Sequence, residues 1–116
     1  MKSKRDEKVF IQDIWECIQK IERYTKNISE RQFELNNEKQ DAVIRRLEII
    51  GEAVKKLSPD FRKKYPDIPW KKIAGMRDLV IHEYFGVSIW LIWLVATSDI
   101  PKLKKEIRKI RKDIGL

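Results

Sequence analysis

Residues 43–57 read VIRRLEIIGEAVKKL, and their apolar side chains repeat with the period of an α-helix. The repeat alternates steps of four and three positions, which keeps these side chains on one side of a helix. They are Val43, Leu47, Ile50, Val54 and Leu57, whereas Arg45, Arg46, Lys55 and Lys56 lie off that side. The stretch predicts a long amphipathic helix that ends at Ser58-Pro59, because proline lacks the N–H that continues a helix.

The upstream sequence predicts another long helix, from about Asp6 to Lys26. Its apolar seam has the same alternating spacing and consists of Ile11, Ile14, Ile18 and Ile21. Phe10, Cys17 and Tyr24 widen this seam into a face that a globular protein buries. Between the two long helices, residues 27–37 contain turn-forming side chains, and Ser29 is placed to cap a short helix there.

The downstream sequence predicts three more helices. Three prolines punctuate residues 58–70, so we expect a short helical turn and a rigid connection there. The next helix should begin near Pro69 and end around Phe85-Gly86. A further helix should begin near Ser88 and meet Asp99-Ile100-Pro101, a pattern typical of a helix cap and restart. The last helix has an apolar seam and a basic outer face; the seam is Ile100, Leu103, Ile107, Ile110 and Ile114.

These patterns predict an all-α fold, an antiparallel four- to five-helix bundle that forms one domain over residues 1–116. No segment alternates apolar and polar residues as an edge strand does. The run Ile89–Val95 is apolar on all sides and must be covered on more than one of them. A second copy of the chain is a natural cover, so we expect a homodimer. The alternative is a central helix wrapped by the others.

The charge and cysteine content bear on the kind of partner and on the compartment. The chain has 26 Lys+Arg against 18 Asp+Glu, a net charge of +8, which favours a polyanionic partner but also simply keeps a helical protein in solution. Cys17 is the single cysteine, which excludes an internal disulfide and suits the reducing cytoplasm. No apolar stretch follows the charged N-terminus, so we expect no secretory signal, and residues 87–96 are too few to cross a bilayer. We therefore expect a cytoplasmic protein.

His82 is the single histidine and the obvious candidate for acid–base chemistry near neutral pH. Asp78 precedes it by four positions and can orient the imidazole. Arg77 falls within an apolar stripe of the same helix, where a cation needs an acidic partner or a bound anion. The stripe is Trp70, Ile73, Ala74, Val80, Ile81 and Phe85.

A purely structural interpretation of these residues is also open. In it, Arg77 makes an internal ion pair with Glu48 or Glu52, and Asp78 with His82 forms a solvated pair. Arg77 and His82 are five positions apart, about 140° around an ideal helix. They do not project in parallel from one helix, so a shared site needs a cleft between two copies or an arginine that reaches round.

The residues from Arg77 onwards resemble the signature of HEPN-domain toxins of the HepT type. The signature is Arg-x-x-x-x-His-x-Tyr, here Arg77, His82 and Tyr84 within GMRDLVIHEYFG at positions 75–86. Three further stretches are similar to motifs of that family: RLEIIGEA at 46–53, IPWKKIAGMR at 68–77, and Asp99-Ile100-Pro101-x-Leu103. The likeness extends from about Phe10 to Ile110, with order and spacing kept.

The resemblance implies an endoribonuclease toxin that needs no metal or cofactor and cuts tRNA or mRNA. It also implies a nucleotidyltransferase antitoxin of the MNT type, which in similar systems transfers AMP to the tyrosine at position 84. Arg77 and His82 would be catalytic, and Asp78 and Tyr84 would support them. These residues suit attack of a ribose 2′-hydroxyl on phosphate, because His82 can move the proton and Arg77 can hold the phosphate. Otherwise Tyr84 would be an interface residue packed on Trp70 or Phe85.

Two other functions remain open from the sequence. One is a non-catalytic helical module that docks a nucleotidyltransferase. The other is an RNA-binding protein without catalysis, which uses the basic last helix.

Overall fold

The computed structural model describes the backbone of residues 4–83 and 88–116, and the side chains of residues 6–78 and 88–116. The described residues contain helices and no strand, which confirms the all-α fold class. The elements are α1 (Lys4–Thr25), α2 (Glu30–Glu34), α3 (Asn37–Lys56), α4 (Pro59–Lys63), α5 (Trp70–Glu83), α6 (Ile89–Leu94), the π-helical segment η1 (Val95–Asp99) and α7 (Ile100–Asp113). Position 84, a predicted site residue, lies outside the described residues.

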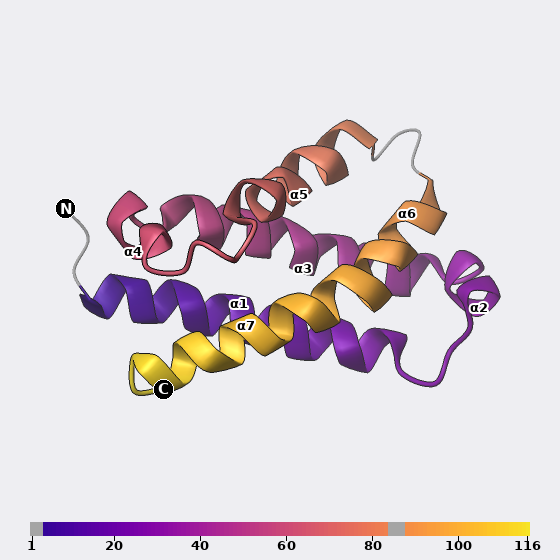
Figure 1. The fold of residues 1–116 in the computed structure, drawn as a ribbon. Helices are drawn as coiled ribbons and strands as arrows, with labels where there is room; N and C mark the ends of the chain where they lie inside the picture. Colours follow the sequence, from indigo (N-terminus) through magenta and orange to yellow (C-terminus); the bar gives the residue numbers. More distant parts are fainter. Residues whose placement is uncertain (1–3, 84–87) are drawn as a thin grey trace.

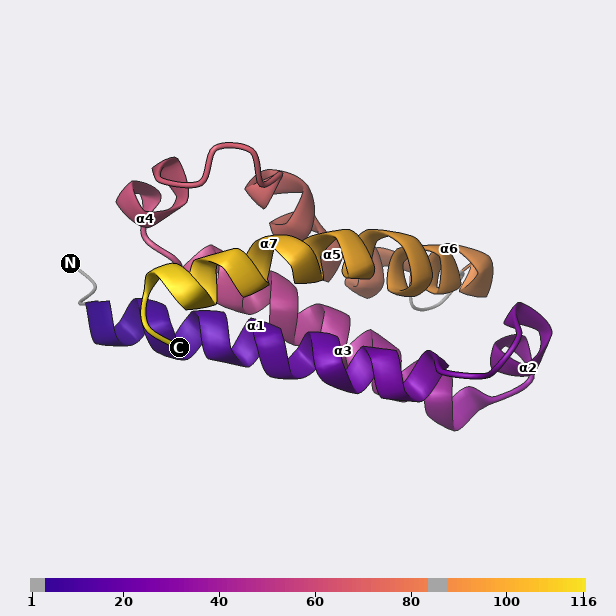
Figure 2. The same cartoon turned by 60° about the horizontal axis from the view of Figure 1, so that its bottom comes forward.

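The long helices pack as an antiparallel bundle. α1 and α3 lie side by side and run in opposite directions, as Figures 1 and 2 show. α5 packs on α3, and α7 packs on α1. Successive long helices therefore run in opposite directions, with α5 against α3 and α7 against α1.

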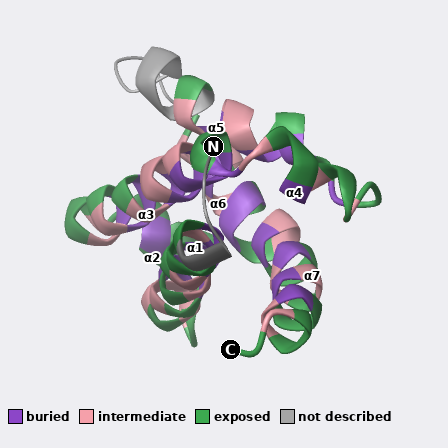
Figure 3. Ribbon diagram, turned by 90° about the vertical axis from the view of Figure 1, so that its left-hand side faces the viewer, coloured by how far each residue is buried: buried purple, intermediate pink, exposed green. Residues whose placement is uncertain are grey.

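The predicted apolar seams form the core. All four isoleucines of the α1 seam are fully buried, and no residue of the α3 seam is more than 1 % exposed. In α7, Ile100, Ile107 and Ile110 are fully buried, and Leu103 is nearly so. Ile114, predicted as the last residue of this seam, follows the helix as its C-cap and is only half-buried against the core. The buried sides of α1, α3 and α7 face one another around the centre of the end-on view in Figure 3. Burial of these side chains is the main favourable contribution to folding.

Side chains cap both short helices, at Ser29 as the sequence predicts and also at Ser58, which was predicted only as part of a helix end. Ser29 and Gln32 form a reciprocal capping box at the start of α2. Ser58 caps α4, in which Pro59 occupies the first turn. Buried Gln40 joins α2 to α3, because its amide donates to the backbone carbonyls of Phe33 and Glu34. The predicted short helices between α1 and α3 and between α3 and α5 are thus confirmed.

The passage from α6 to α7 differs from the prediction. The chain continues through the π-helical η1, and Asp99 does not cap α7: its backbone is helical and its side chain makes no capping hydrogen bond. Pro101 lacks an N–H, and its ring crowds the carbonyl four residues earlier, which a wider π turn accommodates. The carboxylate of Asp99 lies 4.0 Å from the Lys72 ammonium of α5. The cap assigned to Asp99 was wrong, although α7 does begin at Ile100.

α6 is buried on one side only. Ile92 is 1 % exposed, whereas Trp90 is 59 % and Leu94 is 42 % exposed. A central helix wrapped by the others would cover both residues, so that alternative is wrong for this copy of the chain. Of the helices in the described ranges, none combines the length and the apolar character that crossing a bilayer requires.

Candidate functional site

The contact between α3 and α5 depends on Gly51. A Cβ atom at this position would lie 2.8 Å from the Cβ of Arg77 and 3.0 Å from its backbone nitrogen. It would also lie 3.2 Å from the carbonyl oxygen of Ala74. Any larger residue would push α5 away from α3, because the Arg77 and Ala74 atoms that it would meet are fixed by the backbone of α5. The glycine therefore places Arg77 directly against α3.

Arg77 lies at the edge of this contact, beside Glu52. Its Nε is 3.4 Å from Oε1 of Glu52, and each of the two side chains is 38 % exposed. The Nε atom is buried, yet it makes no hydrogen bond of good geometry. Such a half-exposed ion pair contributes little to the stability of the fold. Glu52 restrains the position of the Arg77 side chain but neutralises its charge only in part. Arg77 thus keeps hydrogen-bonding capacity for an anion.

The structural interpretation of Arg77 is correct in part. Its internal acid is Glu52, whereas Glu48 lies 3.4 Å from Arg45 on its own helix. An ion pair that remains partly exposed does not exclude a functional role. A bound phosphate offers the guanidinium two oxygens in place of one distant carboxylate.

Asp78 is an exposed neighbour of Arg77. Its Oδ1 lies 3.5 Å from the Lys55 ammonium of α3, and the Asp78 side chain is 58 % exposed. The backbone of His82 belongs to α5, one turn further on, but its side chain lies outside the described ones. The predicted pairing of Asp78 with His82 therefore stays a prediction, as do the placement of Tyr84 and the angular offset of His82 from Arg77.

Two residues of α3 join the candidate site without having been predicted for it. Gly51 sets the closeness of the helices, and Lys55 pairs with Asp78. A signal for the first was present, because a glycine inside an amphipathic helix costs about 1 kcal/mol relative to alanine and calls for a reason. Lys55 carried no such signal, since a lysine off the apolar seam is an ordinary surface residue.

The described residues contain no group of three or more His, Cys, Asp or Glu side chains that could hold a metal ion. What α3 and α5 bring together at the surface is a guanidinium, two carboxylates and an ammonium: those of Arg77, Glu52, Asp78 and Lys55. This set can bind an anion through Arg77, and His82 in the same helix offers an imidazole for proton transfer.

Comparison with known proteins identifies the family. The family model for ribonuclease HepT-like proteins matches residues 14–110. A Methanocaldococcus jannaschii protein named "Putative RNase" is 51 % identical over 111 residues, which cover 96 % of this chain and 92 % of that protein. "Probable ribonuclease HepT" of Thermococcus cleftensis is 46 % identical over 109 residues, 94 % of this chain and 99 % of that protein.

A further M. jannaschii relative is longer. It is named "Gamma-glutamylcyclotransferase and putative RNase", and this chain is 51 % identical to it but spans only 50 % of its length. No solved structure matches the chain. The match over most of its length shows that the chain belongs to the HepT-like ribonuclease family.

Proposed function

We propose that this protein is a metal-independent endoribonuclease toxin that cleaves tRNA or mRNA at a site built on α5. The observation that carries the proposal is the position of Arg77: Gly51 holds it against α3, Glu52 restrains it, and it stays 38 % exposed. Membership of a ribonuclease family supports RNA as the substrate.

The chemistry proposed for this site is a transesterification. The 2′-hydroxyl of one ribose attacks the adjacent phosphorus, and the bond to the 5′-oxygen of the next nucleotide breaks. A base takes the proton of the 2′-hydroxyl, and an acid protonates the leaving 5′-oxygen. His82 can serve in this proton transfer, because imidazole titrates near neutral pH. The products are a 2′,3′-cyclic phosphate and a 5′-hydroxyl.

Arg77 would stabilise the pentacovalent phosphate. Its planar guanidinium can donate two parallel hydrogen bonds to phosphate oxygens as negative charge develops there. Glu52 would limit the rotamers of the free arginine, so that less entropy is lost when RNA binds. Arg77 would then exchange its single carboxylate contact for the phosphate.

A second copy of the chain is part of the proposal. Arg77 and His82 are about 140° apart on an ideal helix, so a cleft between two α5 helices would bring both to one phosphate. The exposed apolar side of α6, with Trp90 and Leu94, directly follows the catalytic segment in the chain and supplies a surface for such a homodimer.

An MNT-type nucleotidyltransferase antitoxin would inhibit the enzyme by transferring AMP to Tyr84. Tyr84 is seven positions after Arg77, nearly two helical turns, and would lie on the same side of a continuous helix. The added phosphate would compete with RNA for the guanidinium. Incubation with such a partner and ATP should add one AMP to the wild type and none to Tyr84→Phe, as measured by intact mass.

The experiment that tests the proposed reaction is cleavage of total tRNA and of an mRNA transcript in excess EDTA. We expect cleavage to persist and the fragments to carry 2′,3′-cyclic phosphates, identified by mass spectrometry. Cleavage that stops in EDTA and returns with Mg²⁺ would contradict the proposal.

The chain offers a matched control for Arg77. Arg45 is also a partly exposed arginine at 3.4 Å from a glutamate. Arg77→Ala should lower the cleavage rate at least about 100-fold, in the range found when one transition-state donor is lost. Arg45→Ala should leave the rate within about twofold, because the loss of one surface charge changes RNA encounter only slightly. Equal effects of the two substitutions would show that Arg77 acts only through net charge.

A further inference from the structure

We propose that α7, together with Trp15 of α1, forms a second RNA-binding surface that holds the phosphate backbone of the substrate at a distance from Arg77. The inference rests on the proposed function, since it takes RNA to be the substrate. We call the surface the α7 basic face and define it by Lys102, Lys105, Arg108, Lys109 and Lys112, all exposed.

α7 carries more net positive charge than the rest of the chain together. The helix has seven basic and two acidic residues, so it carries a net charge of +5 out of +8 for the whole chain. Basic residues on α7 recur three and four positions apart, a spacing at which like charges repel each other across a helix turn. A bound polyanion would stabilise this helix, because it would reduce the repulsion between the basic side chains.

Few of these charges are neutralised within the protein. Lys109 lies 3.6 Å from Glu106 on its own helix. Lys102, Lys105 and Lys112 make no ion pair with any of the residues that the structure describes. Because α7 is about 20 Å long, the row can contact several successive phosphates.

Trp15 gathers cations along one edge of the α7 basic face, and Arg108 is the one that belongs to the face. The Arg111 guanidinium lies 4.6 Å from the centre of the tryptophan ring, and Lys104 and Arg108 each lie 5.9 Å from it. Arg111 also donates to Oε1 of Gln12 at 3.3 Å. Three cations are thus gathered on one half-buried ring of α1. Cations that are already ordered lose less entropy when they meet phosphates.

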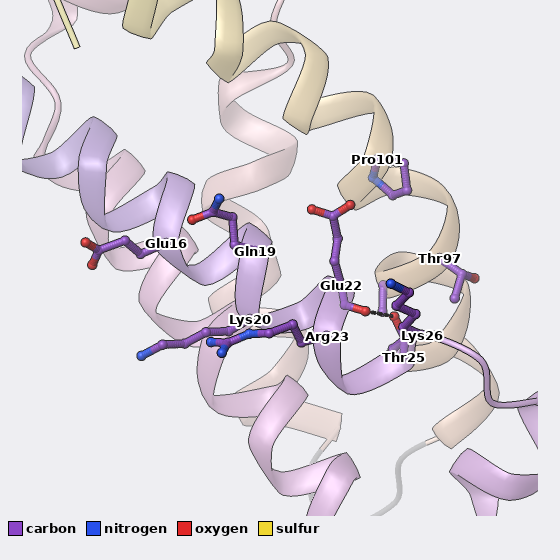
Figure 4. A pocket seen from close by; sticks show the side chains of 10 residues that line it. Glu16, Gln19, Lys20, Glu22, Arg23, Thr25, Lys26, Thr97 and Pro101 are labelled. Atoms are coloured by element: carbon purple, nitrogen blue, oxygen red, sulfur yellow. Dashed lines mark hydrogen bonds between the residues drawn. The ribbon is translucent and has the colours of Figure 1, made fainter.

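The basic surface continues onto α1 beside a groove. Figure 4 shows this groove between the second half of α1 and the junction of η1 with α7. Lys20, Arg23 and Lys26 line it and follow one another every three residues along α1. Glu22 points into the groove, and its carboxylate is paired with Lys104 at 2.8 Å. The ion pair therefore offsets one of the two acids, Glu16 and Glu22, that line the groove.

This surface is distinct from the site at Arg77, although Lys102 at its N-terminal end lines a cavity together with Lys72 and Met76 of α5. Arg77 lies at the contact of α3 with α5, whereas Trp15 lies at the contact of α1 with α7. In Figures 1 and 3, α5 lies at the top of the molecule, and α1 with the C-terminal half of α7 lies below it. An RNA bound to both the Arg77 site and the α7 basic face must extend around the helical body. The α7 basic face therefore contributes to substrate binding and does not take part in the chemical step.

The test measures binding to an RNA that cannot be cut. The probe is a fluorescein-labelled single-stranded RNA of about 20 nucleotides with 2′-O-methyl riboses, titrated with the full chain at several salt concentrations. The α7 variant is Lys105→Ala/Arg108→Ala/Lys112→Ala. The control variant is Arg31→Ala/Lys63→Ala/Lys64→Ala, which removes the same charge from exposed positions on α2 and at α4.

We expect the α7 variant to bind at least about 10-fold more weakly and the control to bind within about twofold of the wild type. The slope of log affinity against log salt should fall by about 2 in the α7 variant, because three phosphate contacts contribute about 0.7 each. Equal losses in both variants would overturn the proposal. So would binding of poly-L-glutamate at this face as tight as that of the RNA, which would indicate an acidic protein as its partner.

A third variant tests the role of Trp15 apart from charge. Trp15→Leu keeps an apolar side chain against α7 and every basic residue. It should weaken RNA binding a few-fold at an unchanged salt slope, with helix content checked by circular dichroism. Unchanged affinity in a folded Trp15→Leu protein would contradict the ordering role.

The outcomes separate this inference from the proposed function. If the wild type cuts no RNA but binds the 2′-O-methyl probe through α7, the cleavage proposal fails and the surface stands. If the wild type and the α7 variant bind and cut RNA equally well, the surface fails and the cleavage proposal stands.

Discussion

Gly51 has no side chain, yet it determines where the candidate catalytic residue Arg77 lies. The helix interior is an unfavourable position for glycine, and at Gly51 the cost is offset by the close approach of α5. Gly75 of α5 is a contrasting case, since a Cβ there would meet no atom within 4 Å in this copy. The two glycines therefore predict opposite effects of the same substitution.

Gly51→Ala should destabilise the protein by about 1–3 kcal/mol, because the new methyl group overlaps the backbone of Arg77. It should also lower RNA cleavage at least about 10-fold, since a shift of about 1 Å at a catalytic group is costly. Gly75→Ala should instead stabilise the protein by about 0.5–1 kcal/mol. Urea denaturation of both variants checks the signs, and a stable, fully active Gly51→Ala protein would contradict this account of the contact.

Cys17 provides a pH-dependent prediction. Burial in the core raises the pKa of its thiol above the ordinary value of 9.0, while nearby Arg46 opposes this. The thiol of the unfolded chain ionises first as the pH rises, so the contribution of Cys17 to stability is present below pH 9.0 and is lost above it. Cys17→Ala should show a smaller fall in unfolding free energy between about pH 8 and 10.

Thermal unfolding followed across that pH range checks the Cys17 prediction. Burial and the nearby Asp113 also raise the pKa of Tyr65, and that contribution is common to both proteins. Identical pH profiles for the wild type and Cys17→Ala would sink the prediction.

At the scale of the helices, the sequence was most informative where apolar spacing and caps agree. The seams of α1, α3 and α7 and the cap at Ser29 could be predicted, because each depends on residues close together in the chain. The η1 segment could not be predicted. Asp-x-Pro is compatible both with a new helix start and with a continuous helix that widens around proline, and tertiary packing decides between them.

The connection from α4 to α5 depends on Trp70. Its indole Nε1 donates to the carbonyls of Arg62 at 3.1 Å and Tyr65 at 3.0 Å, and the ring is nearly buried. Trp70→Phe keeps an aromatic ring but removes this donor, while the two carbonyls keep the backbone N–H groups of Tyr65 and Ile68 as donors. The substitution should therefore cost about 0.5–1.5 kcal/mol of unfolding free energy. Guanidinium denaturation measures the change. A loss below about 0.5 kcal/mol would mean that water replaces the indole.

At the scale of the whole molecule, the candidate site could be predicted only in part. Arg77 and its acid Glu52 were within reach of the sequence, because an arginine in an apolar stripe requires a partner. The closeness set by Gly51 and the pairing of Asp78 with Lys55 depend on the crossing of two helices distant in the chain. The spacing of residues along one helix does not predict how closely α3 and α5 cross.

The exposed side of α6 predicts the oligomeric state. We expect the wild type to be a dimer in sedimentation equilibrium and Trp90→Glu/Leu94→Glu to be a monomer, because buried glutamates oppose association. Val9→Glu changes a half-exposed apolar residue on α1 and should remain dimeric. If the cleft is shared, the monomeric variant should also lose cleavage. A wild type that is monomeric at every concentration and still cleaves RNA would rule out the shared cleft.

The central claim is that the α5 segment with Arg77 and His82 cleaves RNA. The most direct test compares cleavage of RNA by the purified wild type and by His82→Ala, with folding of both checked by circular dichroism. We predict that the substitution lowers the rate at least about 100-fold, because general acid–base catalysis typically contributes about 10²–10⁴-fold. Undiminished cleavage by pure His82→Ala protein would contradict the account.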